Sequence, residues 1–142
     1  MRIPPRILIV DDQPELAEAI AEFLRDEGYD AHICTVGALA LAAVARHQPD
    51  LLILDLLMPA VGGWEILTAL RLQPAFAGLP VLLMSSGIKR ERREFYRRLP
   101  NHTRLIAKPL EYPQLLFAVE MLLHPGLPPP RDARCVWSHG PR

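Results

Sequence analysis

The chain has 142 residues, enough for one well-packed domain and too few for two domains of ordinary size. Half of the residues are hydrophobic, and no apolar run approaches the roughly 20 residues that a membrane-spanning helix needs, so we expect a soluble globular protein without a membrane segment. Lysine and arginine number 16, as do aspartate and glutamate, which gives no electrostatic bias toward nucleic acid.

The cysteines and the N-terminus indicate a cytoplasmic location. Cys34 and Cys135 lie far apart and fit neither the spacing of a metal site nor a disulfide framework. The N-terminus contains Pro4 and Pro5 and lacks the apolar core of a secretory signal. We therefore expect a reducing cytosol and no export.

The first half of the chain alternates short apolar runs with helical patterns. Residues 6–10 read as a strand, and a helix with Pro14 in its first turn follows and ends near Gly28. A weaker strand over 31–34, an alanine-rich helix over 38–46 and an unbroken apolar strand over 51–54 come next. Asp55 directly follows that last strand.

The second half continues the alternation. Gly62 and Gly63 open a turn into a helix over 64–72, and a buried strand over 81–84 ends at Ser85. The elements expected after it are an arginine-rich helix over 91–98, a short strand over 104–107 followed by Lys108, and a last helix from about Pro113 to Leu123.

Five continuously apolar strands that alternate with five helices predict an α/β fold, a doubly wound parallel sheet covered on both faces. We expect residues 1–124 to form this one domain. Residues 125–142 are rich in proline and poor in apolar residues, so they predict a flexible tail.

Polar groups follow four of the predicted strands. Ligands bind beyond the carboxyl ends of the strands in open parallel sheets, so these side chains should converge on one edge. They are Asp11 and Asp12 after the first strand, Asp55 after the third, Ser85 after the fourth and Lys108 after the fifth. Two carboxylates about 5 Å apart repel by roughly 3 kcal/mol at an effective dielectric of about 20, so a proton or a cation must relieve the cluster. Oxygen ligands without a nearby histidine or thiolate favour Mg²⁺.

The strand-end motifs occur together in an order and spacing that resemble the receiver domains of two-component response regulators. They are LIVDDQP, LDLLMP with the following Gly-Gly pair, MSSG after PVLL, and AKP, and the resemblance extends from Arg6 to Leu123. It implies a flavodoxin-like (βα)5 fold with strand order 2-1-3-4-5.

The resemblance also implies a role for each acidic residue. Asp55 corresponds to the phosphoacceptor, and Asp12 to a direct Mg²⁺ ligand. Asp11 corresponds to a carboxylate that acts mainly through metal-bound water, and the backbone carbonyl of Leu57 to a further ligand.

The remaining strand-end groups would contact the phosphoryl group. By the resemblance, Lys108 would neutralise one phosphoryl oxygen, and Ser85 would donate a hydrogen bond to another. Pro109 suggests a cis peptide bond before it, which would direct Lys108 into the site.

The function expected from these roles is that of a single-domain response regulator, a phosphoacceptor and not an enzyme. Its donor would be a sensor histidine kinase or a phosphotransfer protein, and it would signal to a downstream protein through the fourth helix and the fifth strand. The basic stretch Lys89 to Arg98 is a candidate docking surface for an acidic partner there. We expect no nucleic-acid or membrane partner, and a homodimer remains open.

One residue departs from the family pattern, and two others occupy positions that vary among receivers. Leu105 stands where receivers commonly carry Tyr or Phe, which weakens the familiar aromatic coupling to the active-site hydroxyl. Leu57 and Gly87 occupy positions that often orient the attacking water, so we expect slow self-dephosphorylation.

The principal alternative to a phosphoacceptor switch is a phosphorylation-independent adaptor of receiver fold with a vestigial acidic site. A Mg²⁺-dependent phosphatase would need a further acid or base and a substrate cap, which the sequence does not offer.

Overall fold

The computed structural model describes residues 2–87, 99 and 102–126. The arginine-rich helix expected over 91–98 and the part of the expected tail beyond Gly126 lie outside these residues. The basic docking surface expected on that helix therefore stays a prediction.

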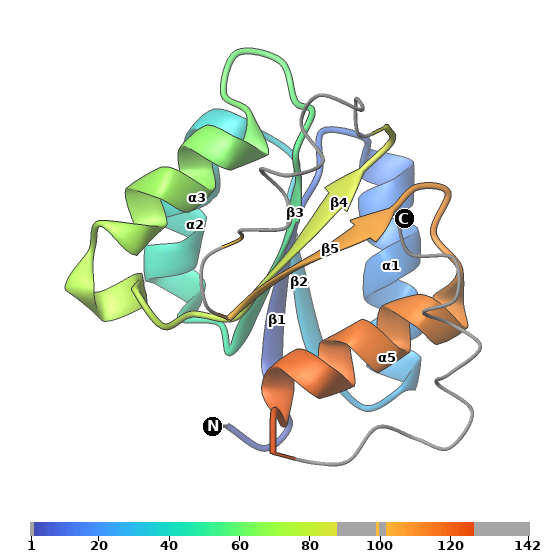
Figure 1. Cartoon of the computed structure of the whole chain (residues 1–142). Helices are drawn as coiled ribbons and strands as arrows, with labels where there is room; N and C mark the ends of the chain where they lie inside the picture. The colour runs from blue at the N-terminus through green and yellow to red at the C-terminus, as the bar shows by residue number, and fades with distance from the viewer. Residues whose placement is uncertain (1, 88–98, 100–101, 127–142) are drawn as a thin grey trace.

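The five strands form one parallel sheet (Figure 1). They are β1 (Arg6–Val10), β2 (Asp30–Cys34), β3 (Leu51–Asp55), β4 (Val81–Ser85) and β5 (Thr103–Ala107). The order across the sheet is β2-β1-β3-β4-β5, which confirms the predicted topology. Every residue of β3 and β4 is buried, because both faces of these inner strands are covered.

Helices cover the two faces in pairs. They are α1 (Pro14–Asp26), α2 (Ala40–His47), α3 (Gly63–Arg71) and α5 (Tyr112–Leu123), with 3₁₀ turns at Gly37–Leu39 and Pro74–Phe76. Figure 1 shows α2 and α3 on one side of the sheet and α1 and α5 on the other. None of the helices within residues 2–87, 99 and 102–126 is both long and apolar enough to cross a bilayer.

Alternation along the strands divides the core into two clusters. On β1, Ile7 and Ile9 pack with α1 and α5, whereas Leu8 and Val10 pack with α2 and α3. Successive side chains of a strand point to opposite faces, so one apolar strand supplies both layers. This arrangement fixes the strand ends, and with them the groups that follow each strand.

The ends of the elements differ from the sequence-based expectation by one or two residues. Gly28 has a φ of 95° just after α1, and the helix ends there as predicted. The alanine-rich helix was expected from Ala38, but the chain first makes the 3₁₀ turn Gly37–Leu39, and the α-helix starts at Ala40. A 3₁₀ turn is common at the start of an α-helix, so residue spacing alone does not distinguish the two.

Candidate functional site

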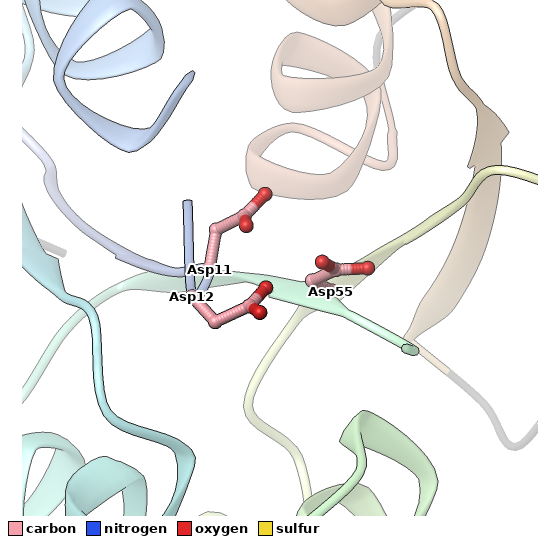
Figure 2. A group of neighbouring side chains, drawn as sticks. All are labelled: Asp11, Asp12 and Asp55. Carbon is pink, nitrogen blue, oxygen red and sulfur yellow. The ribbon is translucent and has the colours of Figure 1, made fainter. Parts of the chain in front are cut away.

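Three predicted acidic residues meet at the carboxyl edge of the sheet (Figure 2). Asp11 and Asp12 directly follow β1, and Asp55 ends β3, which pairs with β1. One carboxylate oxygen from each of the three lies within 4.8 Å of the others. Asp11 and Asp55 are buried, with 0% and 3% of their surface exposed, and Asp12 is half-buried. The convergence expected from the order of the strands is therefore present.

Backbone amides hold one oxygen of each buried carboxylate. The Gln13 N–H donates to Asp11 Oδ1 at 2.9 Å, and the Leu57 N–H donates to Asp55 Oδ1 at 3.2 Å. Each of these bonds joins a side chain to the amide two residues later, which is a common aspartate turn. The second oxygen of each carboxylate is left to face other groups in the site.

Lys108 supplies that partner for both carboxylates. Its Nζ donates to Asp11 Oδ2 and to Asp55 Oδ2, each at 3.2 Å, and only 15% of the side chain is exposed. The backbone N–H of Lys108 donates to the Ser85 carbonyl at 2.7 Å, which anchors it to the end of β4. The Lys108–Pro109 peptide bond is cis, as the sequence suggested.

The charges in the site do not balance. Burial raises the pKa of Asp55, and the nearby Asp11 carboxylate adds to this, while the Leu57 amide and Lys108 oppose it. Burial on its own would lower the pKa of Lys108, but its bonds to Asp55 and Asp11 raise it overall, so the lysine stays a cation. One cation faces three carboxylates, and the surplus negative charge favours a further cation.

The donors fit a magnesium ion. Mg²⁺ prefers oxygen ligands and usually keeps several waters while it takes one or two carboxylates from the protein. Asp12 and Asp55 would supply those carboxylates, and the half-buried position of Asp12 leaves access for water. The role of the Leu57 carbonyl as a further ligand stays a prediction.

The Ser85 hydroxyl lies at the same edge but is engaged in its own turn. It donates to the Gly87 carbonyl at 3.2 Å and accepts from the Gly87 N–H at 3.3 Å, and the residue is 3% exposed. These are local bonds of the kind that serine commonly makes. The predicted hydrogen bond from Ser85 to a phosphoryl oxygen therefore requires the hydroxyl to rotate away from Gly87.

Sequence reasoning missed the close packing of Gly63 against the phosphoacceptor strand. A Cβ on Gly63 would clash with the backbone carbonyl of Asp55. The Gly62–Gly63 pair predicted only a turn, although glycine also allows backbones to approach closely. Gly63 therefore lets the start of α3 lie directly against the residue that carries the central carboxylate.

The sequence of the chain matches a known protein family and several of its described members. The profile of the response regulator receiver domain matches residues 7–120. The chain is 41% identical over 81 residues to the DNA-binding response regulator MtrA of Mycolicibacterium smegmatis and 40% identical over 83 residues to the probable transcriptional regulatory protein TcrX of Mycobacterium tuberculosis. These alignments cover 57% and 58% of this chain but only 34% and 35% of the two relatives. The match thus spans about a third of each relative.

Solved structures match over most of their own length. The chemotaxis protein CheY4 of Vibrio cholerae superposes with a TM-score of 0.75 at 26% identity, over 84% of this chain and 98% of that one. The signal receiver domain of a signal transduction histidine kinase from Syntrophus aciditrophicus gives a TM-score of 0.76 at 28% identity, over 86% and 92% of the two chains. Together with the acidic cluster and the bridging lysine, these matches show that the chain belongs to the response regulator receiver domain family.

Proposed function

We propose that this receiver domain is a switch in which Asp55 accepts a phosphoryl group from a phosphohistidine of a sensor kinase or a phosphotransfer protein. The observation that carries the proposal is the placement of Asp55. One of its oxygens is held by the Leu57 amide, and the other lies 3.2 Å from Lys108. The carboxylate is thus oriented and has a cation beside the oxygen that would face a donor.

The reaction follows from these contacts. An Asp55 oxygen attacks phosphorus in line, a P–O bond forms, and the P–N bond to the donor histidine breaks. The histidine leaves as neutral imidazole if its second ring nitrogen carries a proton. Mg²⁺, when bound, would offset the charge of the carboxylates and of the phosphoryl oxygens. Lys108 would pair with one phosphoryl oxygen as the new acyl phosphate forms. Its flexible ammonium group can pair with the Asp55 carboxylate before transfer and with the phosphoryl group after it.

The product explains why Ser85 belongs in the site. An acyl phosphate carries more charge and more acceptor oxygens than the carboxylate that it replaces. Such an acceptor would compete with the Gly87 carbonyl for the Ser85 hydroxyl, which lies at the neighbouring strand end. We infer that exchange of this hydrogen bond is the first structural response to phosphorylation.

The location and the binding partners of the protein form a second part of the proposal. We infer a cytoplasmic, non-enzymatic protein that signals by binding a protein partner and not nucleic acid, either alone or as a homodimer. The relative MtrA is named as a DNA-binding protein, so DNA binding is the result that would contradict this inference. Gel-shift assays with random-sequence DNA, with and without phosphorylation, would test for it.

Incubation with acetyl phosphate and Mg²⁺, followed by intact mass measurement, tests the central proposal. We expect one added phosphoryl group on the wild type and none on Asp55→Asn, which keeps the shape of the side chain but not the nucleophile. Equal labelling of the two proteins would contradict the proposal. Asp12→Asn serves as the metal-site control, because it should slow labelling while it leaves the acceptor intact.

A further inference from the structure

A groove between the end of β2 and helix α2 lies outside the acidic site. Its volume is about 400 Å³. Its lining includes a cation and several small or apolar side chains, among them Cys34, Val36, Leu39, Ala42, Ala43 and Arg46. β2 is an edge strand of the sheet, so none of the described strands covers this side. The groove is therefore open to a partner.

Helix α2 presents two different faces. Ala40 and Val44 are fully buried against the sheet. Leu39, Ala43 and Arg46 fall three or four residues apart and so share another face, the one that borders the groove. Leu39 is 57% exposed and Val36, across the turn, is 49% exposed. Two large apolar side chains thus stand in water at the rim of an apolar groove.

The charge at the groove is positive. Arg46 is exposed and makes no hydrogen bond or ion pair with any residue in the described part of the chain. The neighbouring His47 is different, because its carbonyl accepts from Arg6 at 2.7 Å and its ring stacks on His32. Among the described residues that line the groove, none is acidic. A carboxylate on an occupant would therefore find a free cation.

The exposed rim distinguishes a protein segment from a small molecule. A small ligand within the groove would cover only the parts of Val36 and Leu39 that line it, whereas an amphipathic segment would also cover their exposed surface at the rim. We propose that the groove between β2 and α2 docks an acidic amphipathic segment of a partner protein, with apolar side chains on Val36, Leu39 and Ala43 and a carboxylate on Arg46. This extends the proposed partner-binding function to the edge of the sheet opposite β5.

Two contacts connect this groove to the acidic site. Cys34 lines the groove, and its carbonyl accepts a hydrogen bond from the Asp11 N–H at 3.2 Å. Gly37, in the turn before α2, lies so close to the loop after Asp55 that an added Cβ would be 2.7 Å from the Val61 carbonyl. The groove therefore borders the segments that carry the phosphoacceptor and its metal ligands.

A backbone-amide NMR titration tests the proposal. The probe is a synthetic amphipathic peptide with leucines on one helical face and glutamate beside them, and the matched control replaces each glutamate with lysine. We expect the glutamate peptide to shift the signals of Thr35, Val36, Leu39 and Ala43. We expect Arg46→Glu to weaken its binding about threefold and to reverse the preference between the two peptides.

Leu39→Ser should weaken the binding of both peptides, since it removes apolar area without changing charge. Both changed residues are exposed, so the fold should be retained. Shifts that map elsewhere, no shifts with either peptide, or equal binding of the two peptides to the wild type would overturn the docking proposal. Acetyl phosphate should label both variants at the wild-type rate, so loss of docking and loss of phosphorylation are told apart.

Discussion

The ammonium nitrogen of Lys108 lies 3.2 Å from a carboxylate oxygen of Asp55, although 53 residues separate the two in the sequence. The same nitrogen is 3.2 Å from Asp11. A single cation is thus shared by two buried carboxylates. An ammonium group has three N–H donors, so the two bonds to Asp11 and Asp55 leave one donor for an incoming anionic group.

Replacement of Lys108 by methionine should slow phosphorylation of Asp55 strongly. The variant keeps the length of the side chain and removes the charge that stabilises developing negative charge, an effect worth about 100-fold in comparable sites. The rate is measured by intact mass after addition of acetyl phosphate at fixed Mg²⁺. The phosphorylation rate of Lys108→Arg should fall between those of the wild type and Lys108→Met, because arginine keeps the charge in a different shape. An unchanged rate in Lys108→Met would remove this lysine from the mechanism.

Magnesium should stabilise the folded protein. A ligand that binds only the native state adds about 2.7 kcal/mol to the free energy of unfolding when its free concentration is 100 times its Kd. We expect Mg²⁺ to raise the melting temperature of the wild type and to have little effect on Asp12→Asn. Sodium chloride at matched ionic strength is the control for charge screening. A wild type whose melting temperature does not respond to Mg²⁺ would argue against the metal site.

Gly63→Ala should destabilise the protein and slow its phosphorylation. The added methyl group would clash with the Asp55 carbonyl, so the start of α3 or the end of β3 has to move. Overpacking of this kind costs about 1–3 kcal/mol. Gly78→Ala is the matched control, because its Cβ would meet nothing within 4 Å. Urea unfolding gives the stability of both variants, and similar losses in the two would refute this account.

The fold and the convergence of the strand-end residues follow from sequence because both depend on polarity and order along the chain. Apolar strands of about five residues, each followed by a helix, can only form a parallel sheet with both faces covered. Asp11, Asp55 and Lys108 then must meet at one edge, since parallel strands end there together. The structure confirms the sheet order and the convergence.

The contacts within the site could not be predicted in the same way. The Ser85–Gly87 turn depends on the side-chain rotamer of Ser85, and the fit of Gly63 to the Asp55 carbonyl depends on how α3 packs. The groove beside α2 is lined in part by Leu39, which lies in a 3₁₀ turn and is 57% exposed. Such features are set by tertiary packing, which a hydrophobic pattern does not specify.

His47 should make the folded protein less stable in mild acid. Burial lowers the pKa of His47 below 6.5, and repulsion from His32, Arg46 and Arg6 acts in the same direction, while Asp30 opposes it. The folded state therefore favours neutral His47. Its contribution is complete above the unfolded pKa and is lost as pH falls through the lower folded pKa.

We expect His47→Gln to lose less stability than the wild type between about pH 7.5 and about pH 5. The free energy of unfolding from urea titrations at each pH gives the comparison. The lowered pKa of Asp30 does not interfere, because stability from that carboxylate is lost only below its ordinary value of 3.8. Parallel pH profiles for the two proteins would show that His47 titrates normally.

Leu57 should prolong the lifetime of the phosphorylated state. Leu57 is 63% exposed beside the buried Asp55, and Gly87, two residues after the end of the neighbouring strand β4, adds no side chain. Neither residue can orient a water toward phosphorus, so hydrolysis loses the advantage of a positioned nucleophile. Leu57→Asn combined with Gly87→Glu should supply that orientation and shorten the lifetime, measured by intact mass after removal of the phosphodonor.

Leu57→Ala separates the orientation of water from the access of water to the acyl phosphate, because it opens the same space without a polar group. If Leu57→Ala shortens the lifetime as much as the polar pair, the side chain acts by shielding the acyl phosphate from water.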